Sequence, residues 1–235
     1  MRSVGSNGLT TPCEVRDHYA FSKITMIKLY YSPGACSLAP HIVLEELDVA
    51  YDTVRISLAE GEQKKSKYLK INPHGRVPAL VVDGKVLTEC TAILAYLGGG
   101  YPARNLWPRE TWKQAQALAL MSWLSSSVHI AVAGIWRPER YSADMATHAA
   151  IKATSRATLE KYFTEINTLL TGKIFVMGSQ YTVCDPYLLV FYRWGNRLGI
   201  DMKQQYPEWT KHALRVFSRP TVKRVFAEEG IQIEG

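Results

Sequence analysis

A strand–helix–strand pattern near the start of the chain constrains the fold more than any other feature. The run "MIKLYY" has the length and apolar character of a strand. In "LAPHIVLEELD", Ala39, Val43 and Leu47 recur every four residues, as one face of a helix requires. The following "YDTVRISL" alternates between apolar and polar residues, which is typical of a second strand. Because a helical crossover joins them, these two strands are expected to pair in parallel.

A hairpin and a helix complete this first unit. The runs "ALVV" and "KVLT" flank Asp83 and Gly84, a strong signal for a tight turn between antiparallel strands. "TECTAILAYL" then predicts a helix that starts near Thr88 to Glu89 and ends at the glycines 98–100. The order of the elements therefore predicts a thioredoxin-like domain with four strands.

The rest of the chain reads as helical. In "ATLEKYFTEINTLL" the apolar residues fall on one helical face, and "YTVCDPYLLVFYRW" begins with Thr182 and Asp185 in a capping-box spacing. Two further short helices are separated at Pro220. The composition changes near residues 104–110. We therefore expect a loose N-terminal extension over 1–25, a thioredoxin-like domain over 26–106 and an all-helical domain over 110–235.

Composition narrows the functional classes. The four cysteines show neither C-x-x-C nor paired spacing, and the six histidines show no ligand motif, so we expect no disulfide framework and no metal. Because of the net charge of +7, nucleic-acid binding has to be considered as a function. The basic residues form no recognisable nucleic-acid-binding motif, so we expect no nucleic-acid partner. A positive field would also attract a small anionic substrate. Lacking a signal peptide and any apolar run of membrane-spanning length, the chain is expected to be soluble and cytoplasmic, without a membrane partner.

Cys36 is the candidate reactive thiol. It follows the break at Pro33 and Gly34 and precedes a predicted helix, whose positive N-terminal end would favour a thiolate. In a C-x-x-C motif the second thiol would stand at Ala39, so exchange between two cysteines of one motif is excluded. The chemistry that remains involves one thiol: a mixed disulfide with a bound thiol compound, or a hydrogen bond to its sulfur.

Several stretches, in this order and spacing, carry a family resemblance. They are "KLYYSPGACSLAPHIVLEE", "INPHGRVPALVVDGKVLTE", "VHIAVAGIWRP", "YTVCDPYLLVFYRW" and "SRPTVKRVFAEEG". Over residues 26–235 the chain resembles the bacterial Beta class of cytosolic glutathione transferases. The resemblance implies a homodimer of two-domain subunits with glutathione as cosubstrate.

The resemblance also implies residue roles. Cys36, followed by Ser37, would lie beside the glutathione sulfur. Val77, preceding a cis Pro78, would pair through its backbone N–H and C=O with the cysteinyl part of glutathione. Glu89 would meet the γ-glutamyl end. The next residue in the family is often Ser or Gly; here it is Cys90, whose backbone N–H can serve while a hydroxyl contact is lost.

Further roles concern the helical domain and the glycyl end. The resemblance places His129 near the glutathione sulfur and Lys64 or Lys65 near the glycyl carboxylate. The electrophile would lie between the domains, and we expect Arg137, Tyr141 and Trp194 to line its site.

Three functions remain open at this stage. The leading one is conjugation of the glutathione thiolate to small hydrophobic electrophiles. The second is a glutathione-dependent thiol oxidoreductase or dehalogenase that uses Cys36 covalently. The third is a non-catalytic carrier of apolar ligands or haem-like anions.

Overall fold

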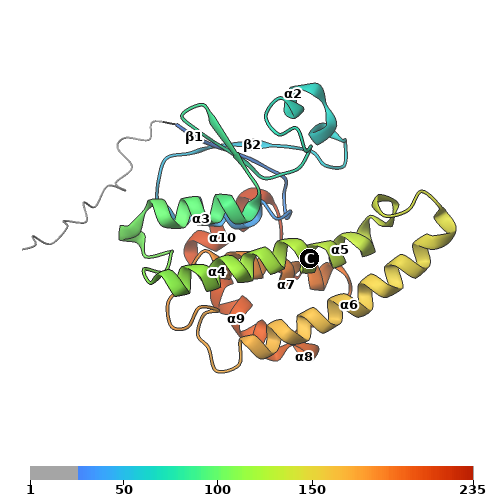
Figure 1. The fold of residues 1–235 in the computed structure, drawn as a ribbon. Helices are drawn as coiled ribbons and strands as arrows, with labels where there is room; N and C mark the ends of the chain where they lie inside the picture. Colours follow the sequence, from blue (N-terminus) through green and yellow to red (C-terminus); the bar gives the residue numbers. More distant parts are fainter. Residues whose placement is uncertain (1–25, 235) are drawn as a thin grey trace, which may run out of the picture.

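The computed structural model describes residues 26–234, in two parts packed against each other (Figure 1). The predicted extension over 1–25 lies outside the described residues. The N-terminal part contains, in order, β1 (Ile27–Tyr31), α1 (Leu38–Leu47), β2 (Asp52–Arg55), η1 (Glu62–Lys64), α2 (Ser66–Leu69), β3 (Ala79–Val82), β4 (Lys85–Thr88), α3 (Cys90–Gly100) and η2 (Pro102–Arg104).

The sheet has the strand order β2-β1-β3-β4. β1 and β2 are parallel, with Tyr30 opposite Val54, as the helical crossover predicts. β3 is antiparallel to both β1 and β4. The β3–β4 turn uses positive φ angles of 47° at Asp83 and 80° at Gly84, which confirms the predicted hairpin. The thioredoxin-like fold is confirmed.

α1 and α3 cover one face of the sheet and separate it from the helical part, whereas α2 lies on the other side (Figure 1). The prediction for the end of α3 is wrong in detail, because the helix includes all three glycines. Gly98 is required by packing: a Cβ at this position would lie 2.8 Å from Cγ1 of Val183, in the segment that leads into α7. The glycine therefore allows a close contact between the two parts.

The second part is all-helical. Its elements are α4 (Thr111–Trp123), the π-helical turn η3 (Leu124–Val128), α5 (His129–Trp136), η4 (Pro138–Arg140), η5 (Met145–Thr147), α6 (His148–Leu169), α7 (Cys184–Arg197), α8 (Met202–Gln205), α9 (Pro207–Phe217) and α10 (Pro220–Glu229). The predicted amphipathic face is confirmed in α6, where Leu159, Phe163 and Ile166 are buried. As expected, α7 is buried on most sides, and it forms the centre of the helical core.

The start of α7 is held by the buried carboxylate of Asp185. Its Oδ2 accepts hydrogen bonds from the backbone N–H of Thr182 at 2.7 Å and from the Thr182 hydroxyl at 3.2 Å. Oδ1 accepts from the N–H of Val176 at 2.9 Å and lies 2.8 Å from Nε2 of His212. The acidic half of the predicted capping box is thus present. The Thr182 hydroxyl instead accepts from the N–H of Cys184, at 3.4 Å.

One expectation about hydropathy needs correction. α4, η3 and α5 form one continuous helix, Thr111–Trp136, that is long and apolar enough by length and composition to cross a membrane. Single polar residues interrupt the apolar ones, so no unbroken run stands out in the sequence. A core helix of a soluble protein passes the same test, and only 39% of this apolar window is buried in the chain.

Candidate active site

The loop from Ser32 to Ser37 joins β1 to α1 and carries Cys36. The Ser37 hydroxyl accepts a hydrogen bond from the N–H of Ser32 at 3.1 Å and donates one to the Ser32 carbonyl at 3.2 Å. Ser37 is completely buried. Its hydroxyl therefore closes the loop on itself, and its expected place beside a glutathione sulfur stays a prediction.

The helical part holds this loop at Gly34. The N–H of Gly34 donates to Oε2 of Glu229 at 2.7 Å, and its carbonyl accepts from Nε1 of Trp194 at 2.9 Å. Gly34 has a φ of 66°, and a Cβ there would lie 2.4 Å from the Arg193 guanidinium, so a glycine is required. Oε1 of Glu229 lies 2.8 Å from Nδ1 of His41, in a buried contact. The position of Cys36 thus depends on residues from the far end of the chain.

Cys36 is held as a neutral thiol. Its side chain is 8% exposed, and Sγ donates a hydrogen bond to the Val77 carbonyl at 3.4 Å. Burial raises the pKa of the Cys36 thiol to about 12, and the negative charge of Glu89 adds to the increase. The N–H groups of Cys36 and Ser37 lower this pKa, as predicted for a helix start, but burial outweighs them.

The segment before β3 lies directly against Cys36. The Val77–Pro78 peptide bond is cis, as the resemblance implies. The preceding carbonyl, of Arg76, accepts hydrogen bonds from the Tyr68 hydroxyl at 2.6 Å and from Nδ2 of Asn72 at 2.7 Å. These contacts fix the backbone on the N-terminal side of Val77. The Val77 carbonyl already accepts the bond from Cys36, and its second lone pair can accept another.

Glu89 and Cys90 form the start of α3 beside this segment. Glu89 is exposed and has a φ of 68°, a left-handed conformation that costs energy for a residue with a side chain. Cys90 is buried, and its Sγ donates to the Cys36 carbonyl at 3.5 Å. Burial, followed by the proximity of Cys36, raises the pKa of the Cys90 thiol well above its usual range. Cys90 thus holds the backbone of the Cys36 loop through this hydrogen bond.

His129 reaches the same region from the helical part. It directly follows the π-helical turn η3, and its N–H bonds the carbonyl of Leu124, five residues earlier. One extra residue in a turn rotates everything after it by about 100° relative to a regular helix. The imidazole packs against Trp194, with ring centroids 4.9 Å apart. Burial, followed by the positive charges of Arg76 and Arg140, lowers the pKa of His129 to about 4, so the ring is neutral at pH 7.

Comparisons with known proteins match this arrangement. A model of the glutathione S-transferase N-terminal domain matches residues 25–99, and one of the C-terminal domain matches residues 128–220. The chain belongs to the glutathione S-transferase family. It is 30% identical to the glutathione S-transferase GstA of Escherichia coli O157:H7 over 213 residues, which covers 88% of this chain and all of that protein.

Solved structures agree with this assignment. A glutathione transferase homologue from Sulfitobacter with bound glutathione superposes with a TM-score of 0.83 at 32% identity, covering 88% of this chain and 99% of the other. A bacterial Beta class enzyme from Sphingomonas chungbukensis gives a TM-score of 0.77 at 34% identity, covering 87% and 100%. The resemblance to bacterial glutathione transferases is therefore confirmed, and the transferase has their two-domain architecture.

Lys64 and Lys65 of the transferase lie in and directly after η1. This segment packs against the loop before Val77: a Cβ on Gly75 would lie 2.9 Å from the Gln63 carbonyl. Lys65 is exposed and its Nζ lies 3.7 Å from Glu62. The structure thus places the backbone next to both lysines against the loop that precedes Val77.

The three residues expected to line the electrophile site lie in different environments. Arg137 directly follows α5 and Tyr141 directly follows η4, and both are exposed. The Tyr141 hydroxyl donates to the Ile130 carbonyl at 3.2 Å. Trp194 is only 3% exposed, because it lies behind His129 and Trp136. Trp194 therefore supports the site from within and presents almost no surface to a substrate.

Two features of the site escaped prediction from the sequence. The π-helical turn before His129 has no known residue signature, since "LSSSV" reads as ordinary helix. The contact between Glu229 and Gly34 joins residues 195 positions apart, and no local pattern reports such a distance. A glutamate at the end of an amphipathic helix reads as a solvated side chain, yet here it is buried.

Proposed function

We propose that this transferase ionises the thiol of bound glutathione and adds the thiolate to small hydrophobic electrophiles, giving thioethers. The observation that carries the proposal is the burial of the Cys36 thiol, whose Sγ donates to the Val77 carbonyl; burial raises its pKa to about 12 and keeps it neutral at pH 7. Two thiolates in contact would repel, so a neutral Cys36 leaves the glutathione sulfur as the group that ionises. Cys36 has one S–H donor, which then turns from the Val77 carbonyl to that thiolate and donates a weak hydrogen bond to it.

Glutathione would bind along the edge formed by Val77, Glu89 and Cys90. The backbone of Val77 pairs with the cysteinyl part, and the carboxylate of Glu89 meets the γ-glutamyl amine. The N–H of Cys90, at the start of α3, is suited to the γ-glutamyl carboxylate, because a helix N-terminus attracts anions. Lys64 or Lys65 pairs with the glycyl carboxylate. The bound glutathione in the Sulfitobacter homologue supports this ligand.

His129 completes the thiolate site from the helical domain. Because its pKa is lowered to about 4, the ring is neutral at pH 7 and can donate one N–H to the glutathione sulfur. Arg137 and Tyr141 line the electrophile site next to His129, and Trp194 packs against the buried side of the His129 ring. The cosubstrate is thus bound mainly by one domain and the electrophile mainly by the other.

The test is to assay two activities in matched variants. Cys36→Ala should keep appreciable conjugation of a generic aryl halide, whereas thiol exchange with glutathione disulfides should disappear. His129→Ala should reduce conjugation. Cys184→Ala, which removes a buried thiol from the helical core, is the control and should keep both activities. Loss of all conjugation in Cys36→Ala, with folding and glutathione affinity intact, would instead favour a covalent thiol oxidoreductase or dehalogenase.

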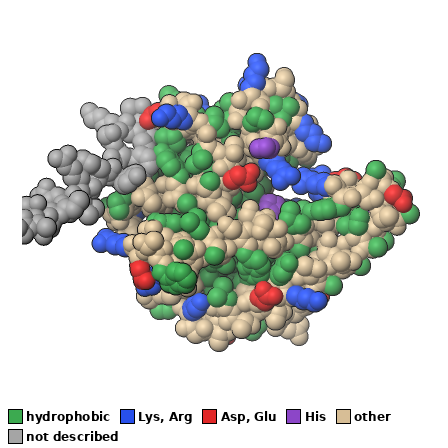
Figure 2. All heavy atoms as spheres, in the orientation of Figure 1, with side chains coloured by type: hydrophobic (Ala, Val, Ile, Leu, Met, Phe, Trp, Pro, Cys, Tyr) green, Lys and Arg blue, Asp and Glu red, His purple; other side chains and the backbone are tan. Residues whose placement is uncertain are grey.

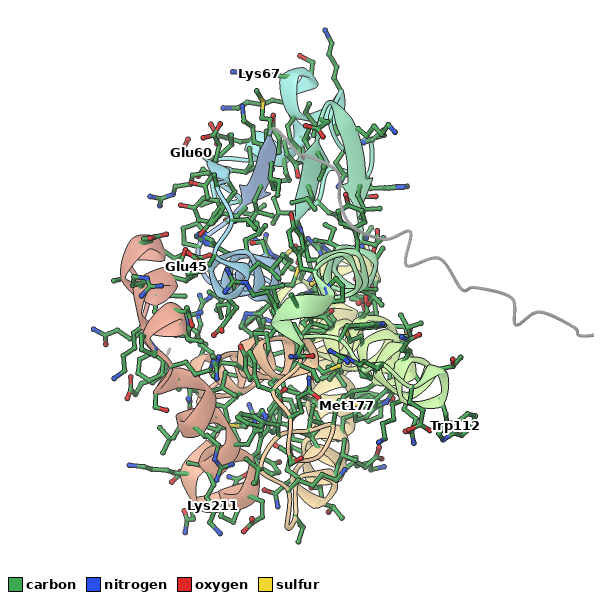
Figure 3. All side chains as sticks on the ribbon, turned by 90° about the vertical axis from the view of Figure 1, so that its left-hand side faces the viewer. Glu45, Glu60, Lys67, Trp112, Met177 and Lys211 are labelled. Carbon is green, nitrogen blue, oxygen red and sulfur yellow. The ribbon has the colours of Figure 1, made fainter. Side chains whose placement is uncertain are left out.

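The subunit is proposed to form a homodimer. The helix from Thr111 to Trp136 is apolar yet mostly unburied, and Trp112 is 69% exposed at the edge of the molecule (Figure 3). A second copy that packs against α4 would remove this surface from water. Trp112→Glu should then lower the mass measured by sedimentation equilibrium. A cytoplasmic location and a role in detoxification complete the proposal.

A further inference from the structure

Arginines from both domains converge on the region of His129. Arg76 immediately precedes Val77, whose carbonyl accepts the hydrogen bond from Cys36. Arg140 ends the short turn η4, which follows α5. The hydrogen bond from Tyr141 to the carbonyl of Ile130 folds this turn back toward the start of α5. Figure 2 shows Lys and Arg side chains gathered beside a histidine in the notch between the two lobes of the molecule.

In the part of the chain that the structure describes, Arg76 and Arg140 have no carboxylate partner, unlike several other arginines. Arg219, for example, binds Glu46 through two bonds of 2.6 and 2.7 Å. Within residues 26–234, neither Arg76 nor Arg140 forms an ion pair, and Arg137 reaches only Glu139, at 4.0 Å, with both side chains exposed. Their charge acts on the site, since Arg76 and Arg140 both lower the pKa of His129. Within the described residues, the guanidinium groups of Arg76 and Arg140 are therefore free of ion pairs, and the carboxylate that acts on the same site is that of Glu89 beside Cys36.

Apolar side chains lie beside these charges. Ile130 and Tyr141 are each 47% exposed, and Trp136 is 36% exposed. The Trp136 ring packs against Trp194 with centroids 5.4 Å apart and carries the Arg197 guanidinium over it at 5.3 Å from its centroid, which fixes its orientation. Aromatic surface next to unpaired guanidinium groups suits a ligand with a flat apolar body and an anionic end.

We propose that the electrophile is an aromatic compound that carries a carboxylate. Its ring lies against Tyr141 and the exposed part of Trp136 that Arg197 and Trp194 leave uncovered, and its carboxylate lies between Arg76 and Arg140. The proposal rests on the proposed conjugation and names the substrate class for that site. In the reaction with an aryl halide, a C–S bond forms to the glutathione sulfur and the C–halogen bond breaks, releasing halide. The carboxylate binds and orients the ring but does not react.

A pair of substrates that differ only in charge provides the test. We would measure kcat/KM for a chlorodinitrobenzoate and for the corresponding chlorodinitrobenzamide. The ratio of benzoate to benzamide should fall about tenfold, equivalent to about 1.4 kcal/mol, in Arg76→Gln and in Arg140→Gln, because each variant loses a charge-assisted hydrogen bond to the carboxylate. Lys203→Gln removes an exposed cation from α8 and is the control for net charge; it should leave the ratio unchanged.

Three results would overturn the proposal. The first is an unchanged ratio in both arginine variants, and the second is an equal fall of the ratio in Lys203→Gln. The third is a higher KM for glutathione with an unchanged ratio, which would assign the arginines to the glycyl carboxylate of glutathione.

Equilibrium binding separates this inference from the proposed function. Quenching of tryptophan fluorescence by the benzoate and by the benzamide, in the presence of S-methylglutathione, measures the preference for charge without turnover. If neither compound is conjugated but the benzoate still binds more tightly, and Arg140→Gln removes this preference, the proposed conjugation fails while the anion site stands. Turnover of both compounds with no preference for charge would reject the anion site alone.

Discussion

Acidification should destabilise the protein through His129, and the size of the effect follows from its burial. The pKa of His129 is lowered from 6.5 to about 4. Between these values the unfolded chain binds a proton that the folded state excludes, so stability falls as the pH falls. At about 1.4 kcal/mol for each tenfold change, the loss between pH 7 and pH 4.5 amounts to about 2.4 kcal/mol for this one residue.

The assay is urea unfolding at pH 7 and at pH 4.5, at one fixed protein concentration. His129→Gln lacks the titrating ring, so it should lose about 2 kcal/mol less stability than the wild type on acidification. The carboxylates titrate in both proteins and cancel in this difference. His74→Gln, which replaces an exposed histidine of the other domain, controls for the loss of an imidazole and should follow the wild type. Equal losses in His129→Gln and the wild type would refute the reasoning.

Three further predictions concern packing and buried polar contacts. Gly98→Ala should lower the free energy of unfolding in urea by about 1 to 3 kcal/mol, because its Cβ would lie 2.8 Å from a neighbouring methyl group. Gly99→Ala, whose Cβ meets nothing closer than 3.8 Å, should raise it by up to about 1 kcal/mol. The opposite order of the two variants would contradict this packing. Asp185→Ala should lower the free energy of unfolding by about 3 to 5 kcal/mol, because it removes a buried carboxylate with four polar contacts. A loss below about 1 kcal/mol would show that water replaces these contacts. Glu229→Ala leaves the N–H of Gly34 without its acceptor, so it should lower the free energy of unfolding by about 1 to 3 kcal/mol and raise the KM for glutathione. An unchanged KM would show that the loop from Ser32 to Ser37 keeps its position without this contact.

Much of the architecture follows from the sequence because the signals are local. Asp83 and Gly84 adopt the positive φ angles that a tight hairpin requires, so the turn was predictable from two residues. The face of α6 that carries Leu159 and Phe163 is buried because the spacing of its apolar residues leaves a single face for the core. The order of strands and helices, together with the rule for crossovers, then leaves few arrangements open.

The chemical state of the site depends on the tertiary structure. The sequence places Cys36 at the start of a helix, where the backbone lowers the thiol pKa, and that effect is present. Desolvation outweighs it, and desolvation depends on which segments cover the sulfur. The same holds for His129, whose pKa is set by burial and by arginines 53 positions before it and 11 after it. Backbone effects act over one turn and can be read along the chain, whereas burial and charge act through space and arise only when distant segments pack together.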